Sequence, residues 1–331
     1  MHDTGGVPAT FALIGAAGYI APRHMRAIKD TGGQLVAAFD PADSVGQMDT
    51  FFPETRFFVE FERFDRHVDK LRRRGELIDF ISICSPNYLH DAHVRFALRS
   101  GAHAICEKPL VLNPWNIDGL QEVEQSTGRK VNTILQLRLH PSIIALKEMV
   151  AANGQDRKHE VDLTYITSRG RWYYASWKGD EQKSGGIATN IGVHFYDMLG
   201  FVFGPLQESY VHHRAADCAS GYLEYEKARV RWFLSINRRD LPQNIPDGQT
   251  TFRSITIDGE ELEFSSGFTD LHTQSYEQIG ADSGFTLDDV RPSVETVSQI
   301  RNATIDPSKG EQHPFLSGAL DEQRYRNGFP V

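Results

Sequence analysis

Short apolar runs alternate with amphipathic stretches through the first 140 residues, a pattern typical of a sheet with helices on both faces. Five such runs predict strands: Phe11–Ile14, Leu35–Phe39, Phe80–Cys84, Ala102–Cys106 and Val131–Leu137. A strand that is apolar on both sides must be covered on both sides, so its neighbours should run parallel. We therefore expect a first domain, residues 1–137, with a doubly wound α/β fold.

The second half, residues 138–331, has the pattern of a half-exposed sheet. Alternating or strand-like runs are Val161–Thr167, Glu208–His213, Ser220–Tyr225, Arg229–Ile236 and Ser254–Phe264, the last with Asp258-Gly259 as a hairpin turn. Helices are expected over Ile187–Phe203, Leu271–Ile279 and Leu287–Ala303. These elements predict an α/β domain with an open-faced, mostly antiparallel sheet, a face that in a cytosolic enzyme usually packs against another subunit.

Composition narrows the classes of function. The 331 residues are 40% hydrophobic and carry a formal charge of −9, which argues against a nucleic-acid-binding or polybasic membrane protein. No apolar run approaches the ~20 residues of a membrane helix, and no signal peptide is visible. Three cysteines without a CxxC pair fit a reducing cytoplasm. We expect a cytoplasmic globular protein.

A glycine-containing turn follows the first predicted strand and opens the first predicted helix. Its cofactor-contacting residues are expected to be Gly15, Ala17, Gly18, Tyr19 and Ile20. Glycines there allow the backbone to approach a pyrophosphate at the helix N-terminus, although the spacing departs from GxGxxG. Asp40 ends the second strand, where a carboxylate accepts hydrogen bonds from the adenosine ribose and repels a 2′-phosphate. The predicted cofactor is NAD.

Two further loops leave the carboxyl edge of the predicted sheet, where open α/β sheets bind ligands. Ser85, Pro86 and Asn87 follow the third strand and precede His90, and we expect all four to contact the cofactor. Glu107-Lys108-Pro109 follows the fourth strand. An ammonium beside a substrate hydroxyl stabilises the alkoxide that develops as hydride leaves, so Lys108 is a catalytic candidate.

A second candidate lies in the predicted helix after Gly185-Gly186. Asn190 and His194 are four residues apart and share a helical face, with Asp197 three residues further on. An imidazole is a natural proton acceptor near neutral pH, but a structural pairing of His194 with Asp197 is an alternative. No Cys or His stands at a useful spacing for zinc in this helix, so no metal is predicted.

Together these motifs resemble the glucose–fructose oxidoreductase/inositol dehydrogenase (Gfo/Idh/MocA) family. Within it the chain is most similar to a bacterial subgroup that oxidises UDP-N-acetylglucosaminuronate. The runs that carry the resemblance are Phe11–Ala27, Ile81–His90, Ile105–Val111, Val161–Trp172, Ile187–Asp197 and Phe268–Thr273.

The resemblance implies a Rossmann domain, an open-sheet α/β domain and a homotetramer. It implies NAD-dependent oxidation of the C3′ hydroxyl of UDP-N-acetylglucosaminuronate to the 3-keto sugar, for surface polysaccharide (O-antigen, lipopolysaccharide) biosynthesis, with an aminotransferase acting next. It makes Lys108 and His194 the catalytic pair, either of them the base, and places Glu107 against the nicotinamide ribose. Many members have Asp where this chain has Asn190, so Asn190 is expected to bind substrate rather than relay a proton.

Cations concentrate in the segment after Thr167, on a chain that is acidic overall. Planar guanidinium groups suit the diphosphate and carboxylate of a UDP-sugar acid, and a solvated loop balanced by Asp180 and Glu181 is the alternative. Arg169 or Lys178 is favoured for the carboxylate, with Trp177 nearby. Gln136, expected at the cofactor, and Arg138, expected at the substrate, lie where the fifth strand leaves the first domain and could face the same cleft.

Two other functions fit parts of the pattern. The same fold could oxidise a free sugar or a polyol such as inositol, in which case UDP would not compete with substrate. A non-catalytic NAD-sensing regulator is disfavoured because Lys108 and His194 are both present. Whether 2-oxoglutarate re-oxidises the NADH in place is open, since no motif decides it.

Overall fold

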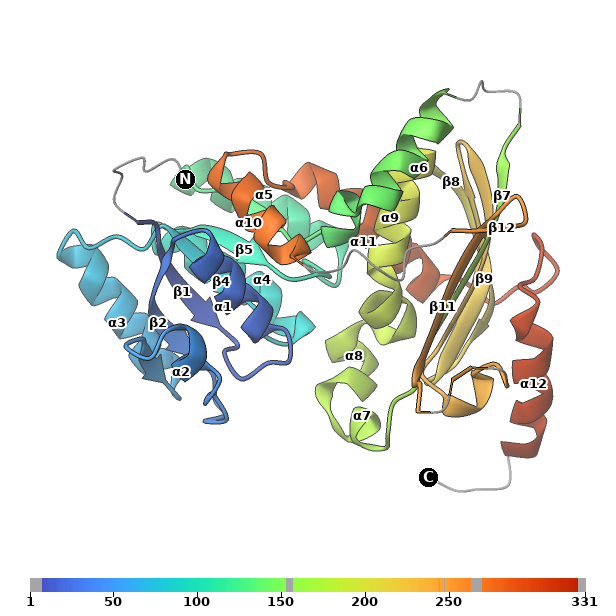
Figure 1. Cartoon of the computed structure of the whole chain (residues 1–331), viewed down its shortest axis with the longest axis horizontal. Coiled ribbons are helices and arrows are strands. Elements are labelled where there is room, and N and C mark those ends of the chain that lie inside the picture. The colour runs from blue at the N-terminus through green and yellow to red at the C-terminus, as the bar shows by residue number, and fades with distance from the viewer. Residues whose placement is uncertain (1–7, 153–156, 244, 247, 263–269, 327–331) are drawn as a thin grey trace. The chain divides into compact units, whose positions relative to one another are not determined.

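A computed structural model describes residues 8–152, 157–243, 245–246, 248–262 and 270–326 (Figure 1). By its contacts the chain divides into two compact units, residues 1–139 with 268–291 and residues 140–267 with 292–331. The domain division expected from the sequence, 1–137 and 138–331, stays a prediction. Among the described residues, no helix is both long and apolar enough to cross a membrane.

The first unit is built on a parallel sheet in the order β3-β2-β1-β4-β5-β6, which confirms the predicted fold class. Its strands are β1 (Thr10–Ile14), β2 (Gln34–Phe39), β3 (Arg56–Phe58), β4 (Phe80–Ile83), β5 (His103–Cys106) and β6 (Val131–Thr133). The order reverses between β1 and β4, so the loops after these strands open a crevice at the carboxyl edge.

Helices cover this sheet because its strands are buried on both faces. They are α1 (Ala21–Asp30), α2 (Met48–Phe51), α3 (Phe61–Arg73), α4 (His90–Arg99), α5 (Pro114–Thr127) and α10 (Leu271–Gly280). The late segment α10 packs against α1, and its Tyr276 and Ile279 share a core cluster with Met25 and Ile28 (Figure 1). This unit thus takes residues from both halves of the sequence.

Two details of the first unit differ from the sequence prediction. The strand predicted over Val131–Leu137 ends at Thr133, and a 3-10 turn occupies Gln136–Leu139. Leu135, Leu137 and Leu139 are buried in or beside that turn, so an apolar run here does not mean a strand. Strand β3 was not predicted, because it is only three residues long, with Arg56 exposed and Phe57 and Phe58 half-buried.

The second unit contains the sheet β12-β11-β7-β10-β9-β8. Its strands are β7 (His159–Thr167), β8 (Leu206–Arg214), β9 (Cys218–Tyr225), β10 (Ala228–Ser235), β11 (Thr251–Ile257) and β12 (Glu260–Glu261). Every pair is antiparallel except β7 with β10, which confirms a mostly antiparallel sheet. Asp258 and Gly259 both have positive φ, as the predicted hairpin turn requires; residues 263–264 of that prediction lie outside the described residues.

Helices lie on both faces of this second sheet. They are α6 (Pro141–Ala152), α7 (Trp172–Ala175), α8 (Glu181–Ser184), α9 (Val193–Phe203) and α12 (Phe315–Arg326), while α11 (Leu287–Asn302) has residues in both units. Trp232 of β10 packs against Tyr196 of α9, and the next residue, Phe233, points to the opposite face and packs against Phe315 of α12. Helix α12 was not predicted, so this face is less open than expected.

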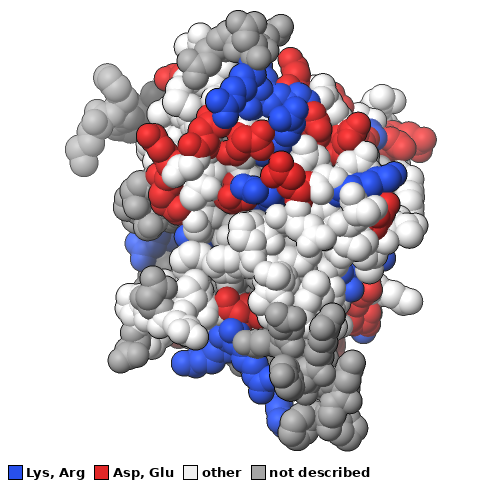
Figure 2. Space-filling view, turned by 90° about the vertical axis from the view of Figure 1, so that its right-hand side faces the viewer, with Lys and Arg blue, Asp and Glu red and all other residues white. Residues whose placement is uncertain are grey.

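Charged side chains occupy the part of this face that the aromatic contacts with α12 leave uncovered. Arg229 pairs with Glu160, and Arg231 pairs with Asp162, its neighbour across the parallel β7–β10 pair. Figure 2 shows acidic and basic side chains interleaved over the upper part of the view and mostly uncharged ones across its middle. Exposed ion pairs contribute little stability individually, so this charge pattern bears more on solubility and association than on the fold.

Candidate functional site

The glycine turn lies directly on the end of strand β4. Gly15 has a φ of 90°, and a Cβ placed there would stand 2.6 Å from the carbonyl carbon of Cys84. Its N–H donates to the Phe39 carbonyl at 2.8 Å, which joins the turn to the end of β2. Gly18 approaches the same Cys84 carbonyl, whereas Tyr19 is fully exposed. The backbone therefore comes close to the switch point, as a turn that receives a pyrophosphate must.

Asp40 holds this turn in place. Its Oδ2 accepts the Ala17 N–H at 2.9 Å and its Oδ1 accepts the Ala42 N–H at 2.9 Å. The side chain is largely buried at the end of β2. A carboxylate oxygen accepts more than one hydrogen bond, so Asp40 keeps the capacity to receive a ribose hydroxyl.

His90 connects the loops that follow β4 and β5. Its Nδ1 lies 2.7 Å from the Pro109 carbonyl oxygen and its Nε2 lies 2.8 Å from the Ser85 carbonyl oxygen. Burial lowers the pKa of His90, while the two carbonyl contacts oppose that effect. Ser85 in turn contacts His93 at 2.8 Å, and Asn87 is buried in the same loop. His90 therefore supports the two loops, rather than facing solvent.

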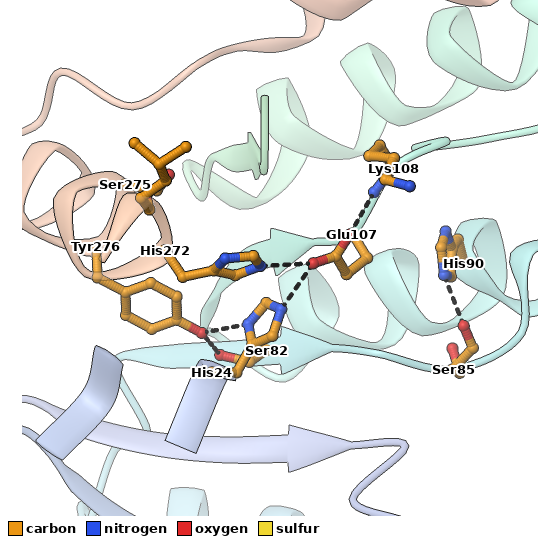
Figure 3. A network of polar contacts seen from close by, with 10 residues as sticks. His24, Ser82, Ser85, His90, Glu107, Lys108, His272, Ser275 and Tyr276 are labelled. Carbon is orange, nitrogen blue, oxygen red and sulfur yellow. Dashed lines mark hydrogen bonds and ion pairs between the residues drawn. The ribbon is translucent and has the colours of Figure 1, made fainter. Parts of the chain in front are cut away.

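Glu107 is the centre of a buried polar network (Figure 3). Its Oε1 lies 3.1 Å from His24 Nε2 and 3.0 Å from His272 Nε2, and its Oε2 accepts the Lys108 N–H at 3.2 Å. Burial alone raises the pKa of Glu107, but the hydrogen bonds from the two histidines outweigh it and hold the pKa well below its usual range. The carboxylate is therefore ionised. In the sequence analysis His24 and His272 entered only within the resemblance runs Phe11–Ala27 and Phe268–Thr273, with no role assigned to either.

Lys108 follows this anchored carboxylate and is half-buried at the carboxyl edge of the sheet. Gln136 is half-buried too, and its Oε1 has no hydrogen-bond partner among the described residues. A buried acceptor without a donor fits a residue that receives a ligand donor. Arg138 is engaged within its own unit: its Nη2 donates to the Asp289 carbonyl at 2.7 Å and its guanidinium lies over Phe285. Its predicted contact with substrate stays a prediction.

These residues fit the predicted dinucleotide. The turn at Gly15 supplies the close backbone approach, Asp40 an acceptor for the ribose, and Gln136 a buried acceptor further along the same edge. The assignment of each to a cofactor atom stays a prediction.

In the second unit, the predicted helix over Ile187–Phe203 does not begin as a regular α-helix. Residues Ala188–Gly192 form a π turn and α9 follows from Val193. Gly192 packs so closely on β10 that a Cβ would meet Leu234 Cδ1 at 2.6 Å. A π turn therefore replaces the regular α-helix expected around Asn190, and the shared face of Asn190 and His194 stays a prediction; such turns are frequent at functional sites.

Asn190 and His194 are both half-buried and have aromatic neighbours. Asn190 Nδ2 donates to Tyr173 Oη at 2.7 Å, and the hydroxyl belongs to a buried residue that sequence reasoning missed. The His194 ring packs edge-on against Tyr165 at 6.0 Å between centroids. Lys108 lies in the first unit and His194 in the second, so their predicted meeting on one substrate stays a prediction.

A cavity of about 240 Å³ lies beside the cation-rich segment. Its lining includes Lys178, Arg214 and Arg301, together with Glu181 and Gly185-Gly186. Arg214 is held by the Ile300 and Ala303 carbonyls, and burial lowers the pKa of Arg301. Three cations against one carboxylate make this cavity suitable for an anion. Arg214 and Arg301 carried no sequence signal, because they come from separate elements.

The other predicted residues of that segment lie outside the cavity lining. Lys178 Nζ sits 3.8 Å above the Trp177 ring, a cation–π contact that orients the ammonium. Arg169 is exposed, and its backbone N–H donates to the Ile236 carbonyl. Of the two residues favoured for the substrate carboxylate, Lys178 is the one that reaches the cavity.

A parallel sheet with a switch point, a glycine turn at its carboxyl edge and a second α/β unit are typical of two-domain NAD-dependent oxidoreductases. Residues 9–134 match the family model described as "Oxidoreductase family, NAD-binding Rossmann fold", and residues 147–279 match its C-terminal alpha/beta domain. The chain belongs to the Gfo/Idh/MocA oxidoreductase family.

Two solved structures of one relative are similar over nearly the whole chain. The WlbA (WbpB) dehydrogenase from Thermus thermophilus in complex with NAD and UDP-GlcNAcA has 50% sequence identity and a TM-score of 0.89. The same dehydrogenase with NAD and alpha-ketoglutarate has 52% identity and the same TM-score. Both comparisons cover 93% of this chain and 100% of the other.

Curated relatives are similar over shorter stretches. A putative UDP-kanosamine synthase oxidoreductase subunit from Amycolatopsis mediterranei is 32% identical over 129 residues, which is 39% of this chain and 35% of that protein. The chain thus spans about a third of that relative's length.

Proposed function

We propose that the protein oxidises the C3′ hydroxyl of UDP-N-acetylglucosaminuronate (UDP-GlcNAcA) to a ketone with NAD⁺. The observation that carries the proposal is the 50% identity, over 93% of the chain, to a dehydrogenase solved with NAD and UDP-GlcNAcA. Lys108 and His194, the two residues able to move the hydroxyl proton, are both present in this chain.

NAD⁺, when bound, accepts the hydride from C3′. The substrate hydroxyl loses its proton as the C3′–H bond breaks, and Lys108 or His194 receives that proton or stabilises the alkoxide. Asn190, fixed by Tyr173 Oη, is proposed to orient the sugar by a hydrogen bond. Each residue acts on the hydroxyl or the sugar, and no step requires a metal ion.

The substrate carries a diphosphate and a carboxylate, and the cavity at Lys178, Arg214 and Arg301 is proposed to hold one of these anionic groups. A pocket lined by three cations has no evident use for a neutral polyol such as inositol. This favours a nucleotide sugar acid over the uncharged alternatives.

The proposal also covers the next enzyme in the pathway, the assembly and location of the protein, and the re-oxidation of NADH. The 3-keto product suits an aminotransferase as the next enzyme in surface polysaccharide biosynthesis. A homotetramer in the cytoplasm is inferred, with no nucleic-acid or membrane partner. Because a relative was crystallised with alpha-ketoglutarate, 2-oxoglutarate is proposed to re-oxidise the NADH in place.

The test is NADH formation by the purified protein with NAD⁺ and UDP-GlcNAcA, beside UDP-GlcNAc and myo-inositol as uncharged-sugar controls. The proposal expects turnover with the uronate and competitive inhibition by UDP. Turnover of inositol without inhibition by UDP would contradict the nucleotide-sugar assignment, and no NADH from any of the three would contradict the reaction. Adding 2-oxoglutarate to a single-turnover reaction then shows whether NADH absorbance decays.

A further inference from the structure

The Glu107 network has a definite direction of hydrogen bonding. An ionised carboxylate oxygen only accepts, so His24 and His272 both carry their proton on Nε2. His24 Nδ1 is then an acceptor and receives the Tyr276 hydroxyl at 2.8 Å. Tyr276 Oη in turn accepts from Ser82 Oγ at 2.6 Å. The chain runs Ser82 to Tyr276 to His24 to Glu107, as the dashed lines in Figure 3 follow.

His24 is a neutral donor in this network. Burial lowers the pKa of His24 despite its hydrogen bond to Glu107. His24 is fully buried, and the Glu107 and His272 side chains are only 8% and 7% exposed. The Glu107 carboxylate is therefore stabilised by the N–H donors of two imidazoles and of Lys108, because an isolated buried carboxylate would be too costly.

The charge acts on its surroundings at the carboxyl edge of the sheet. The pKa of the buried Cys84 thiol is raised, first by burial and then by the negative charge of Glu107. Cys84 directly follows β4 and its backbone lies against Gly15, so the charge of Glu107 acts close to the turn where the cofactor is expected. An oxidised nicotinamide ring carries a positive charge that the reduced ring lacks.

We propose that His24, His272 and Tyr276 are positioning residues that hold Glu107 as a buried anion, and that this anion makes the site favour NAD⁺ over NADH. The inference rests on the proposed use of NAD at this edge of the sheet. Helix α10, supplied by the second half of the sequence, thereby becomes part of the cofactor site. A lower affinity for NADH than for NAD⁺ makes the bound NADH a stronger reductant, which assists its re-oxidation.

The experiment is to titrate the protein with NAD⁺ and with NADH separately, without sugar, and to compare the two dissociation constants. Glu107→Gln keeps the shape and removes the charge, so we expect the ratio Kd(NADH)/Kd(NAD⁺) to fall about tenfold. His272→Leu should lower it in the same direction, and His272→Gln, which restores an N–H donor, should recover part of the ratio. His103→Gln, at the opposite end of β5, is the matched control and should leave it unchanged.

A role in folding alone would weaken binding of both cofactor forms equally, so an unchanged ratio in Glu107→Gln overturns the inference. Tyr276→Phe removes only a hydroxyl and is expected to lower the ratio by a smaller factor. If His272→Leu does not fold, Tyr276→Phe replaces it as the test of the network. The three ligand atoms of His24, Glu107 and His272 lie within 4.8 Å of one another, so metal analysis is included. One equivalent of bound metal would overturn the hydrogen-bonded account.

The outcome is distinguishable from failure of the proposed function. A shifted ratio in a protein that turns over no nucleotide sugar would support this inference and contradict the substrate assignment. Turnover of UDP-GlcNAcA by the protein, with a Kd(NADH)/Kd(NAD⁺) ratio unchanged in Glu107→Gln, would support the substrate assignment and contradict this inference.

Discussion

At Gly15, the backbone conformation and the space around it both exclude a side chain. The φ of 90° is one that other residues rarely adopt, and the Cys84 backbone fills the position of a Cβ. The sequence placed this glycine at the cofactor turn, but could not show that the close contact is with β4. That contact depends on strand order, which no local pattern encodes.

Gly15→Ala is predicted to lower the free energy of unfolding by about 3 kcal/mol or more, since backbone strain and a steric clash add. NAD binding should be lost in any folded fraction. Gly101→Ala is the matched control: its φ is 88° but nothing lies within 4 Å, so about 1–2 kcal/mol is expected. Urea unfolding checks both; equal losses in the two variants would contradict the close-contact argument.

Lys108→Met and His194→Ala are each predicted to reduce turnover by about 10²-fold or more, the usual scale for removing acid–base assistance. Steady-state rates of NADH formation measure the effect. Lys70→Met, an exposed lysine of α3, is the control and should keep the normal rate. Near-normal rates in both catalytic variants would show that neither residue handles the proton.

The candidate catalytic residues have clearer sequence signals than the residues that contact them. Lys108 and Glu107 follow a clear strand signal, whereas His24 and Tyr276 are brought to Glu107 only by tertiary packing of α1 against α10. Arg214 and Arg301 likewise meet at a cavity from distant elements. Residues that come together from distant segments have no characteristic spacing in the sequence, so no local motif reveals them.

At the scale of elements, apolar runs were reliable for buried strands and unreliable at their ends. The prediction continued β6 through a buried 3-10 turn and treated the π turn at Ala188–Gly192 as regular helix. It missed α12, a helix that packs through few apolar residues such as Phe315 and Ala319. Where hydrophobic periodicity is weak, tertiary contacts decide the local structure.

His90 connects two elements of the first unit, because its ring contacts one backbone carbonyl in the loop after β4 and one in the loop after β5. His90→Leu leaves buried acceptors unpaired and is predicted to lower the free energy of unfolding by about 2 kcal/mol. KM for NAD⁺ should rise about tenfold, because both cofactor loops loosen. His67→Leu, on α3, is the control. An unchanged KM with reduced stability would limit His90 to a folding role.

For the whole molecule, buried histidines make stability depend on pH. Burial lowers the pKa of His93 in the first unit and of His313 in the second to about 4. The unfolded chain therefore binds more protons between about pH 6.5 and 4, and stability falls as the pH is lowered through that window. Each histidine contributes a slope of about 1.4 kcal/mol per pH unit.

Urea midpoints measured at about pH 7.5, above this window, and at about pH 6 and pH 5, within it, check the slope. His93→Gln and His313→Gln should each flatten the decline, after allowance for their lower stability at neutral pH. A midpoint that stays constant or rises on acidification would contradict the burial of neutral histidines.

The central claim is that hydride leaves C3′ of the uronate for the nicotinamide. UDP-GlcNAcA deuterated at C3′, mixed with the protein and NAD⁺, tests it directly by mass spectrometry of both products. The account predicts deuterium in the reduced cofactor and a sugar product without it. Unlabelled NADH, or a sugar that keeps its deuterium while NADH forms, would contradict the account.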